Sequence, residues 1–217
     1  MSGFGAALLG AVATLVVACS PPDAAPPANA DGPQKLCGVA SEAYDVGYQA
    51  KLDALVGCTR FLGSLRFGDS QFTNLDQLES LRSVDGSVNL FRNQSLLTID
   101  GLRNLESVGG ELRVAFHDQL TSLSGLANLR SVGALTSIGS NSKLTTLDGL
   151  QQLRSVGDLW IVGNSSLQSL QALSGLESAA GDVAILHNPM LPQAAAEAFV
   201  AVLNPTGTVT VSNNGGI

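Results

Sequence analysis

Apolar residues recur along this chain at a spacing of 23 or 24 residues. The stretch 105–128, LESVGGELRVAFHDQLTSLSGLAN, shows the repeat most clearly. Its first position is occupied by Leu81, Leu105, Leu129, Leu153 and Leu176, and its sixteenth by Leu96, Leu120, Leu144, Leu167 and Leu191. A repeat of this length is one turn of a solenoid, which must stack on its neighbours to bury its apolar face. We therefore expect a mostly β solenoid of about six coils over residues 59–190.

Each repeat contains two apolar residues separated by one other residue, as in Val88 with Leu90 and Leu112 with Val114. This alternation predicts a short strand with one face inward. In the third coil, Leu135 and Ile138 cannot both point inward on a regular strand, so a β-bulge is expected there. The residues between the inward ones should face outward in columns. The central column is Arg66, Asn89, Arg113, Ser137, Trp160 and Ala184, and Phe91, Val162 and Leu186 lie beside it.

A polar residue stands just after each predicted strand. These residues are Asn93, His117, Asn141, Asn164 and Asn188. A side chain turned inward at this corner can satisfy backbone N–H and C=O groups, so they are expected to form a structural ladder. Glycines at positions 101, 125 and 149 should permit the tight backbone of the next corner.

The segments that flank the repeats predict helices that close the two ends of the stack. The spacing of Tyr48, Leu52 and Leu55 predicts a short helix over 49–56, after a brief strand over 44–46. Residues 191–203 predict a second helix, followed by a strand around Val209 and Val211. We therefore expect residues 37–58 to form an N-terminal cap and residues 191–217 a C-terminal cap.

The first residues carry a targeting signal. Residues 1–19 form an uncharged apolar run that is too short for a transmembrane helix. The sequence Val16-Val17-Ala18-Cys19 resembles the lipobox of bacterial lipoproteins, in which the cysteine becomes the lipidated first residue. An ordinary signal peptide or a buried helix are the alternatives. Residues 20–36 are rich in proline and alanine, which predicts a tether. The lipid is expected to attach the protein to a membrane of the bacterial envelope, at the outer membrane or cell surface.

The remaining cysteines favour a disulfide. If Cys19 is acylated, Cys37 and Cys58 are an even pair in an exported, oxidising setting. Their disulfide would close a loop of roughly 21 residues and contribute about 3 kcal/mol in the chain-entropy model. It would join the N-terminal cap to the first coil.

The charge and the absence of catalytic motifs argue against several classes of function. The chain has 11 Lys and Arg against 18 Asp and Glu, and no basic run interrupts the repeats, which argues against a nucleic-acid partner. It contains no G-x-S-x-G, H-E-x-x-H or paired C-x-x-C motif, so neither catalysis nor a cofactor is expected. Two sequons, at Asn93 and Asn164, fall on ladder positions, which argues against attached sugar.

Three features together resemble one family: the segment from Cys37 to Cys58, the Leu65-Arg66-Phe67 strand, and the repeated L-x-S-V-x-G with its following Asn and L-x-x-L-x-G-L. They resemble the receptor L domain, the leucine-rich module of insulin and epidermal growth factor receptor ectodomains. The resemblance covers about residues 37–217 and implies a right-handed β-helical fold. It does not extend to signalling, because the chain lacks a kinase and a cysteine-rich neighbour.

The outward columns are the candidate binding surface. Its proposed residues are Arg66, Asn89, Phe91, Arg113, Trp160 and Val162, where an exposed tryptophan could anchor a protein or glycan partner. The alternative is that Trp160 packs against a loop or a cap. Asp158 and Asp182 fall on successive coils and could form a calcium site or an acid pair, or a solvated edge. Besides a binding module, a carbohydrate-active β-helix enzyme and a purely structural envelope protein stay open.

Overall fold

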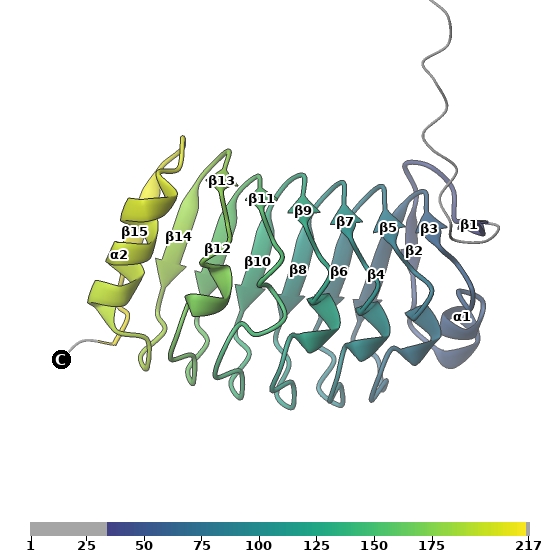
Figure 1. Cartoon of the computed structure of the whole chain (residues 1–217). Helices are drawn as coiled ribbons and strands as arrows, with labels where there is room; N and C mark the ends of the chain where they lie inside the picture. The colour runs from purple at the N-terminus through teal and green to yellow at the C-terminus, as the bar shows by residue number, and fades with distance from the viewer. Residues whose placement is uncertain (1–33, 216–217) are drawn as a thin grey trace, which may run out of the picture. The chain divides into compact units, whose positions relative to one another are not determined.

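The computed structural model describes residues 34–215, and these contain two parallel β-sheets and few helices (Figure 1). One sheet has eight described strands, in the order β15 (Val209–Ser212), β14 (Val183–Leu186), β12 (Leu159–Val162), β10 (Thr136–Gly139), β8 (Leu112–Ala115), β6 (Val88–Phe91), β4 (Ser64–Gly68) and β2 (Ala43–Asp45). The other has seven, in the order β1 (Leu36–Cys37), β3 (Arg60–Phe61), β5 (Ser83–Val84), β7 (Ser107–Val108), β9 (Ser131–Val132), β11 (Ser155–Val156) and β13 (Ser178–Ala179).

The strand register follows the sequence repeat. Val88 pairs with Leu112, and Leu112 pairs with Thr136, so equivalent residues of successive repeats lie side by side. The chain alternates between the two sheets, and each strand pairs in parallel with the next strand of its own sheet. We call the chain from one strand of the eight-stranded sheet to the next a coil. The mostly β prediction is confirmed, and the arrangement is consistent with a parallel β-solenoid.

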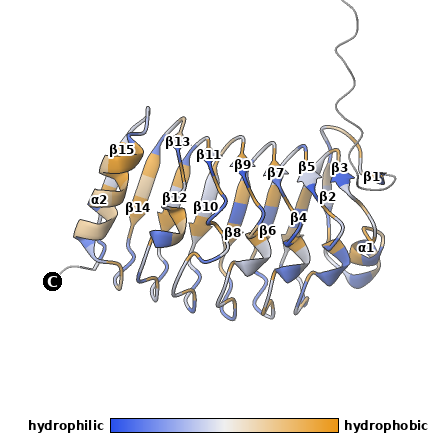
Figure 2. Ribbon diagram, in the orientation of Figure 1, coloured by the Kyte–Doolittle hydropathy of each residue, from blue (hydrophilic) through white to orange (hydrophobic). Residues whose placement is uncertain are grey.

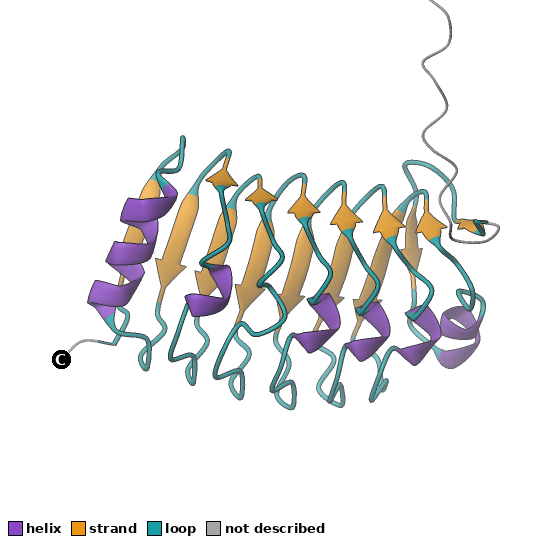
Figure 3. Ribbon diagram, in the orientation of Figure 1, coloured by secondary structure: helices purple, strands orange, loops and turns teal. Residues whose placement is uncertain are grey.

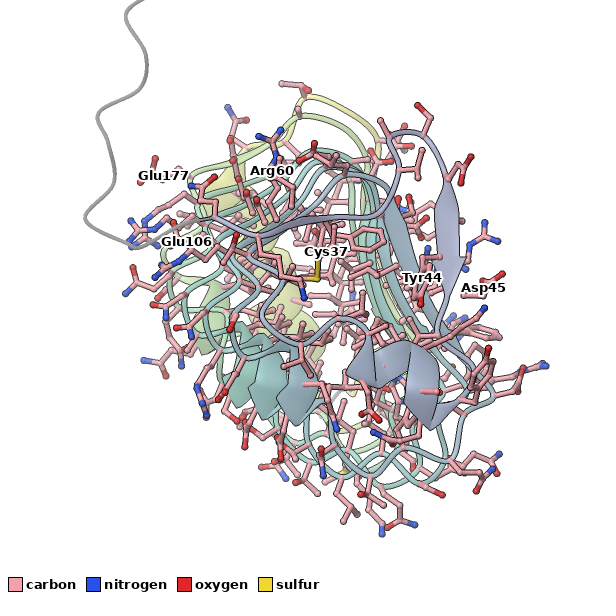
Figure 4. The ribbon with its side chains drawn as sticks, turned by 90° about the vertical axis from the view of Figure 1, so that its right-hand side faces the viewer. Cys37, Tyr44, Asp45, Arg60, Glu106 and Glu177 are labelled. Atoms are coloured by element: carbon pink, nitrogen blue, oxygen red, sulfur yellow. A yellow bond between two sulfur atoms is a disulfide. The ribbon has the colours of Figure 1, made fainter. Side chains whose placement is uncertain are left out.

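The core lies between the two sheets and runs through the described body as one cluster of buried side chains. Leucines that share a repeat position, such as Leu105, Leu129 and Leu153, have no exposed surface. Figure 2 shows strongly apolar and polar residues alternating along the strands, as expected for a sheet with one face inward. In the view of Figure 4, Tyr44 and Cys37 point into the interior, whereas Asp45 points away from it.

Short helices occupy the corners between the sheets (Figure 3). The 3₁₀ helices are η1 (Asp76–Leu78), η2 (Asp100–Leu102), η3 (Ser124–Leu126) and η4 (Gln171–Leu173). Helix α1 (Gln49–Asp53) is shorter than the predicted 49–56 helix, because the chain continues in i→i+3 turns that lead to Gly57, where φ is +77°. Helix α2 (Gln193–Leu203) begins after Pro192 and packs against β15.

The corner glycines are required by the approach of the neighbouring coil. A Cβ atom on Gly101 would overlap the carbonyl oxygen of Leu75, and one on Gly125 would overlap that of Ile99. Among the three, only Gly149 also has a positive φ, of +117°. These glycines were predicted to permit a tight corner backbone, whereas at Gly101 and Gly125 the main constraint is contact between coils.

The prediction of a β-bulge in the third coil is wrong. Strand β10 pairs regularly on both sides, with Thr136 opposite Leu112 and Ile138 opposite Val114. Thr136, not Leu135, is the inward residue and has no exposed surface. Threonine has nearly the shape of valine, so it fills the apolar position without changing the strand. Its Oγ1 is buried without a hydrogen-bond partner in the described residues. This lowers stability relative to an apolar side chain of the same shape.

The N-terminal boundary also differs from the prediction. The signal segment with Cys19 and residues 20–33 of the tether lie outside the described residues. Leu36, the last residue assigned to the tether, already pairs with Arg60 in the seven-stranded sheet, and the Lys35 carbonyl accepts the N–H of Thr59 at 2.9 Å. The predicted disulfide between Cys37 and Cys58 is confirmed.

We predict that Gly125→Ala lowers the free energy of unfolding by about 2 kcal/mol or more, because the new methyl group overpacks against backbone that cannot move independently of the sheets. Urea unfolding at pH 7.5 measures this change. Gly47→Ala is the matched control, since nothing lies within 4 Å of a Cβ atom there. Equal effects at both positions would contradict the proposed contact between coils.

Candidate functional site

The solvent side of the eight-stranded sheet, here called the outer face, carries the predicted columns. The strand register aligns Arg66 with Asn89, Asn89 with Arg113, and Arg113 with Ser137. The row continues to Trp160 and Ala184. A second row contains Gly68, Phe91, Ala115, Gly139, Val162 and Leu186. The structure therefore places all six candidate binding residues on one face.

Trp160 is the centre of the apolar part of this face. It lies on β12 between Ser137 of β10 and Ala184 of β14, and it is 40% exposed. Because both neighbours are small, they leave much of the indole uncovered. The indole is neither sealed in the core nor covered by a cap within the described residues.

A hollow of about 420 Å³ opens beside Trp160, and we call it the apolar hollow. Its floor consists of small residues, among them Ala115, Ser137 and Gly139. Larger side chains stand on both sides of this floor: Phe91 and Phe116 on one side, and Trp160, Val162 and Leu186 on the other. The difference in side-chain size between neighbouring coils therefore creates the hollow.

The aromatic side of the apolar hollow includes a residue that the sequence analysis did not select. Phe116 follows β8 and is 45% exposed. Its ring meets that of Phe91 edge-on, with 5.1 Å between the centroids. The Arg92 guanidinium lies 5.1 Å from the Phe91 ring centroid and 6.0 Å from that of Phe116. The strand alternation could not reveal Phe116, because the chain has already left the strand there and turned at the corner.

That corner has a left-handed backbone in coil after coil. The residues with positive φ just before the ladder are Asp69, Arg92, Phe116, Ser140, Gly163, His187 and Asn213. Phe116 has φ of +62°, a conformation that costs non-glycine residues roughly 1–2 kcal/mol and that Asn and Asp tolerate better. The left-handed corner is thus part of the repeat, and Phe116 is the apolar side chain among the residues that occupy it.

A second, charged hollow of about 510 Å³ adjoins the first and shares Phe91 and Arg113 with it. Its charged lining residues are Asp45, Arg66, Asp69, Glu111 and Arg113. Arg113 Nη2 lies 2.8 Å from Glu111 Oε1, whereas Arg66 forms no ion pair with any residue between 34 and 215. The outer face therefore changes from charged to apolar along the stack.

The predicted ladder residues are buried and connect successive coils. Asn141 Oδ1 accepts the N–H of His117 at 3.2 Å, and its Nδ2 donates to the carbonyl of Val114 at 2.9 Å. Asn164 repeats this pattern on the N–H of Asn141 and the carbonyl of Ile138. The structure adds a residue at each end. Ser70 accompanies Asn93, and Asn214 accompanies Asn188.

His117 interrupts the amide pattern. Its Nδ1 and Nε2 each lie 3.2 Å from a carbonyl oxygen, of Asn93 and Leu90 respectively. A neutral imidazole can donate only one hydrogen bond, so one ring nitrogen faces a carbonyl without a proton between them. Burial lowers the pKa of His117 below its ordinary value of 6.5, against the opposing effects of the two carbonyls and of Asp118.

The carboxylates of Asp158 and Asp182 accept hydrogen bonds from backbone N–H groups of the next coil. Asp158 Oδ1 accepts the N–H of Asp182 at 2.8 Å, and Asp182 Oδ1 accepts the N–H of Thr208 at 2.7 Å. Ser64 and Ser87 bind the next coil in the same way at 2.9 Å. These residues form a second ladder at the start of the strands. The described residues contain no group of three His, Cys, Asp or Glu that could hold a metal ion.

No family model matches the sequence, and no curated protein does. Among the helices that the structure describes, none is long and apolar enough to cross a membrane.

We predict that lowering the pH from 7.5 to 5 destabilises the protein partly through His117. Because the pKa of His117 is lowered in the folded state, the unfolded chain binds this proton at a higher pH. The associated stability is present above pH 6.5 and is lost as the pH falls toward the folded pKa. His117→Asn should therefore weaken the pH dependence of the free energy of unfolding. Urea unfolding of the parent protein and of His117→Asn at pH 7.5 and pH 5 measures that dependence, and equal dependence in both would contradict the prediction.

We predict that Phe116→Asn is more stable than Phe116→Ala by about 0.5–1 kcal/mol, because both remove the ring but asparagine tolerates the left-handed backbone better. Thermal melts compare the two variants. Thr121 is exposed and has a negative φ, so Thr121→Asn should show no such advantage over Thr121→Ala. If the two Phe116 variants had the same stability, the corner would not be strained.

Proposed function

We propose that this protein is a non-catalytic binding module that recognises a protein or glycan partner through the outer face. The observation that carries the proposal is the apolar hollow with the 40% exposed Trp160 at its edge. Exposed apolar side chains that gather on one surface and are rimmed by polar residues are typical of interaction sites, and aromatic and arginine side chains are prominent in the energetics of interfaces. Arg66, Asn89, Phe91, Arg113 and Val162 complete the proposed surface.

The proposed fold is a right-handed solenoid of about six coils that resembles the receptor L domain. Its ends would be closed by residues 37–58 with α1 and by residues 191–217 with α2. The packing of α2 on β15 and the disulfide between Cys37 and Cys58 support these assignments. An end cap is needed because the last coil of a stack otherwise exposes its apolar interior.

We also propose that the protein is lipid-anchored in a bacterial envelope through Cys19, at the outer membrane or cell surface. The support is the lipobox-like sequence before Cys19 and the disulfide, which is typical of an oxidising compartment. A body that begins near residue 34 would then extend from the membrane on a short tether.

A binding role is favoured over catalysis by the use of the acidic side chains. The carboxylates of Asp158 and Asp182 accept backbone hydrogen bonds from the next coil, which supports a structural role for both. A catalytic pair would need carboxylates available to a substrate and a proton to transfer. The purely structural envelope protein differs from our proposal in having no ligand at the outer face.

The proposed function is tested with Trp160→Ala in the full-length protein. Loss of the indole should reduce binding to a glycan array or to solubilised envelope components at least tenfold, as expected for an aromatic interface anchor. Val202→Ala on α2, where the side chain is 87% exposed, is the control for loss of an exposed apolar group. Binding that survives Trp160→Ala in a folded protein would contradict the assignment of this face, and release of sugars lost in Asp158→Asn would favour an enzyme.

A further inference from the structure

The apolar hollow has few groups that could hydrogen-bond a sugar. Its polar side chains are Arg113, Ser137 and Ser140, the Trp160 indole adds one N–H donor, and the remaining lining is apolar or glycine. Arg113 Nη2 is paired with Glu111 Oε1 at 2.8 Å, whereas Arg113 Nε is buried without a hydrogen-bond partner in the described residues. A sugar carries hydroxyl groups around the edge of its ring, and each one that is buried without a partner weakens binding. An apolar side chain has no hydrogen bonds to lose on burial. The apolar hollow therefore suits an apolar side chain better than a sugar.

The dimensions fit a side chain that is presented by another polypeptide. The volume of about 420 Å³ lies within the range of about 300–1,000 Å³ that is usual for small-ligand sites, with room for one or two large side chains. The small floor residues lie between the Phe91–Phe116 pair and Trp160, so an inserted side chain would meet aromatic rings on both sides. Side chains that fill well-packed, desolvated pockets carry much of the binding energy at protein interfaces, and aromatic residues are prominent among them.

Next to the two phenylalanines that line the apolar hollow lies a positive charge without an acidic partner in residues 34–215. The Arg92 guanidinium lies over the two phenylalanine rings, and no carboxylate between residues 34 and 215 forms an ion pair with it. Asp69 occupies the equivalent corner of the preceding coil, Asp118 follows the ladder of the next coil, and neither is paired with Arg92. Stacking on the rings holds the guanidinium in place, with its donors available to a carboxylate.

We propose that the apolar hollow receives a bulky apolar side chain of a polypeptide partner, and that Arg92 pairs with an Asp or Glu next to that side chain. This inference rests on the proposed function, because it assigns a ligand chemistry to the same outer face. The chain carries a net charge of −7, so its long-range field does not attract an acidic partner. The preference for an acidic residue therefore comes from the local contact with Arg92.

The strain at Phe116 is consistent with this role. A polar residue at this corner would relieve the backbone, yet it would remove one wall of the apolar hollow and one of the two rings under Arg92. The phenylalanine thus sacrifices some stability of the free protein for a better binding surface, as is common where function conflicts with local backbone preference.

The test is a selection of random 12-residue peptides on the immobilised full-length protein, followed by affinity measurements on the selected peptides. We expect enriched peptides to place Leu, Phe or Trp beside Asp or Glu. Ser137→Phe fills the floor of the apolar hollow and should weaken their binding more than tenfold. Ser131→Phe is the matched control, because it makes the same change in the same coil on the seven-stranded sheet.

Arg92 variants test the acidic preference separately. Arg92→Gln should weaken binding two- to fivefold, as expected for an exposed ion pair, and should remove the advantage of Asp or Glu over Asn or Gln in the peptide. Arg92→Lys should retain part of that advantage because it keeps the charge. Arg103→Gln, at an arginine that pairs with Glu79 at 2.8 Å, is the control and should have no effect. Melting curves establish that each variant is folded.

The inference would be overturned by any of the following results. The first is peptide binding that is unaffected by Ser137→Phe, and the second is enrichment without acidic residues. The third is a dimer of the protein that Ser137→Phe dissociates, which would assign the apolar hollow to a second copy. Binding of glycans but not peptides, lost in Trp160→Ala, would refute the inference while the proposed function stands. If neither peptides nor glycans bind the outer face, the inference and the proposed function are both refuted.

Discussion

Contact between successive coils is the constraint on which this structure depends. A single coil exposes an apolar face and leaves the backbone groups of its strands unpaired, and both deficits are removed only by the next coil. The backbone of one coil approaches the next so closely at Gly101 and Gly125 that no side chain fits between them. Two ladders of side chains, one at the start and one after the end of the longer strands, add hydrogen bonds between the same coils. The stack is therefore held at a spacing that each coil imposes on its neighbours.

The outer face follows from this stacking. Because inward positions must fill the core in every coil, the residues between them are free of the demands of the core and can vary from coil to coil. Arginine, serine and tryptophan can occupy one column, and phenylalanine, alanine and glycine the next. Differences in size between neighbouring residues of a column then produce hollows on a flat sheet. The repeat supplies a regular frame, and departures from regularity supply the shape of the surface.

Two departures from the repeat lie next to each other in the chain. Phe116 occupies a left-handed corner that suits smaller polar residues, and His117 occupies a ladder position that suits asparagine. Both are expected to lower the stability of the free protein, Phe116 through backbone strain and His117 through a carbonyl left without a hydrogen bond. Phe116 lies in the lining of the apolar hollow. This coil therefore departs from the usual corner and ladder residues at the place where the outer face is most apolar. Local rules in proteins are most often violated where a binding or catalytic surface needs it.

The sequence by itself determined the repeat, the inward leucines, the strand pattern and the buried corner amides, because periodicity and side-chain polarity are local properties. It also sufficed to pair Cys37 with Cys58. The tertiary structure decided that Thr136 fills a core position, that Gly101 and Gly125 are needed for contact between coils, and that Asp158 and Asp182 bind backbone. It alone placed Phe116 in the lining of the hollow that Trp160 also lines, and Arg92 over the Phe116 ring, because the orientation of a corner residue depends on how coils stack in three dimensions and leaves no periodic mark in the sequence.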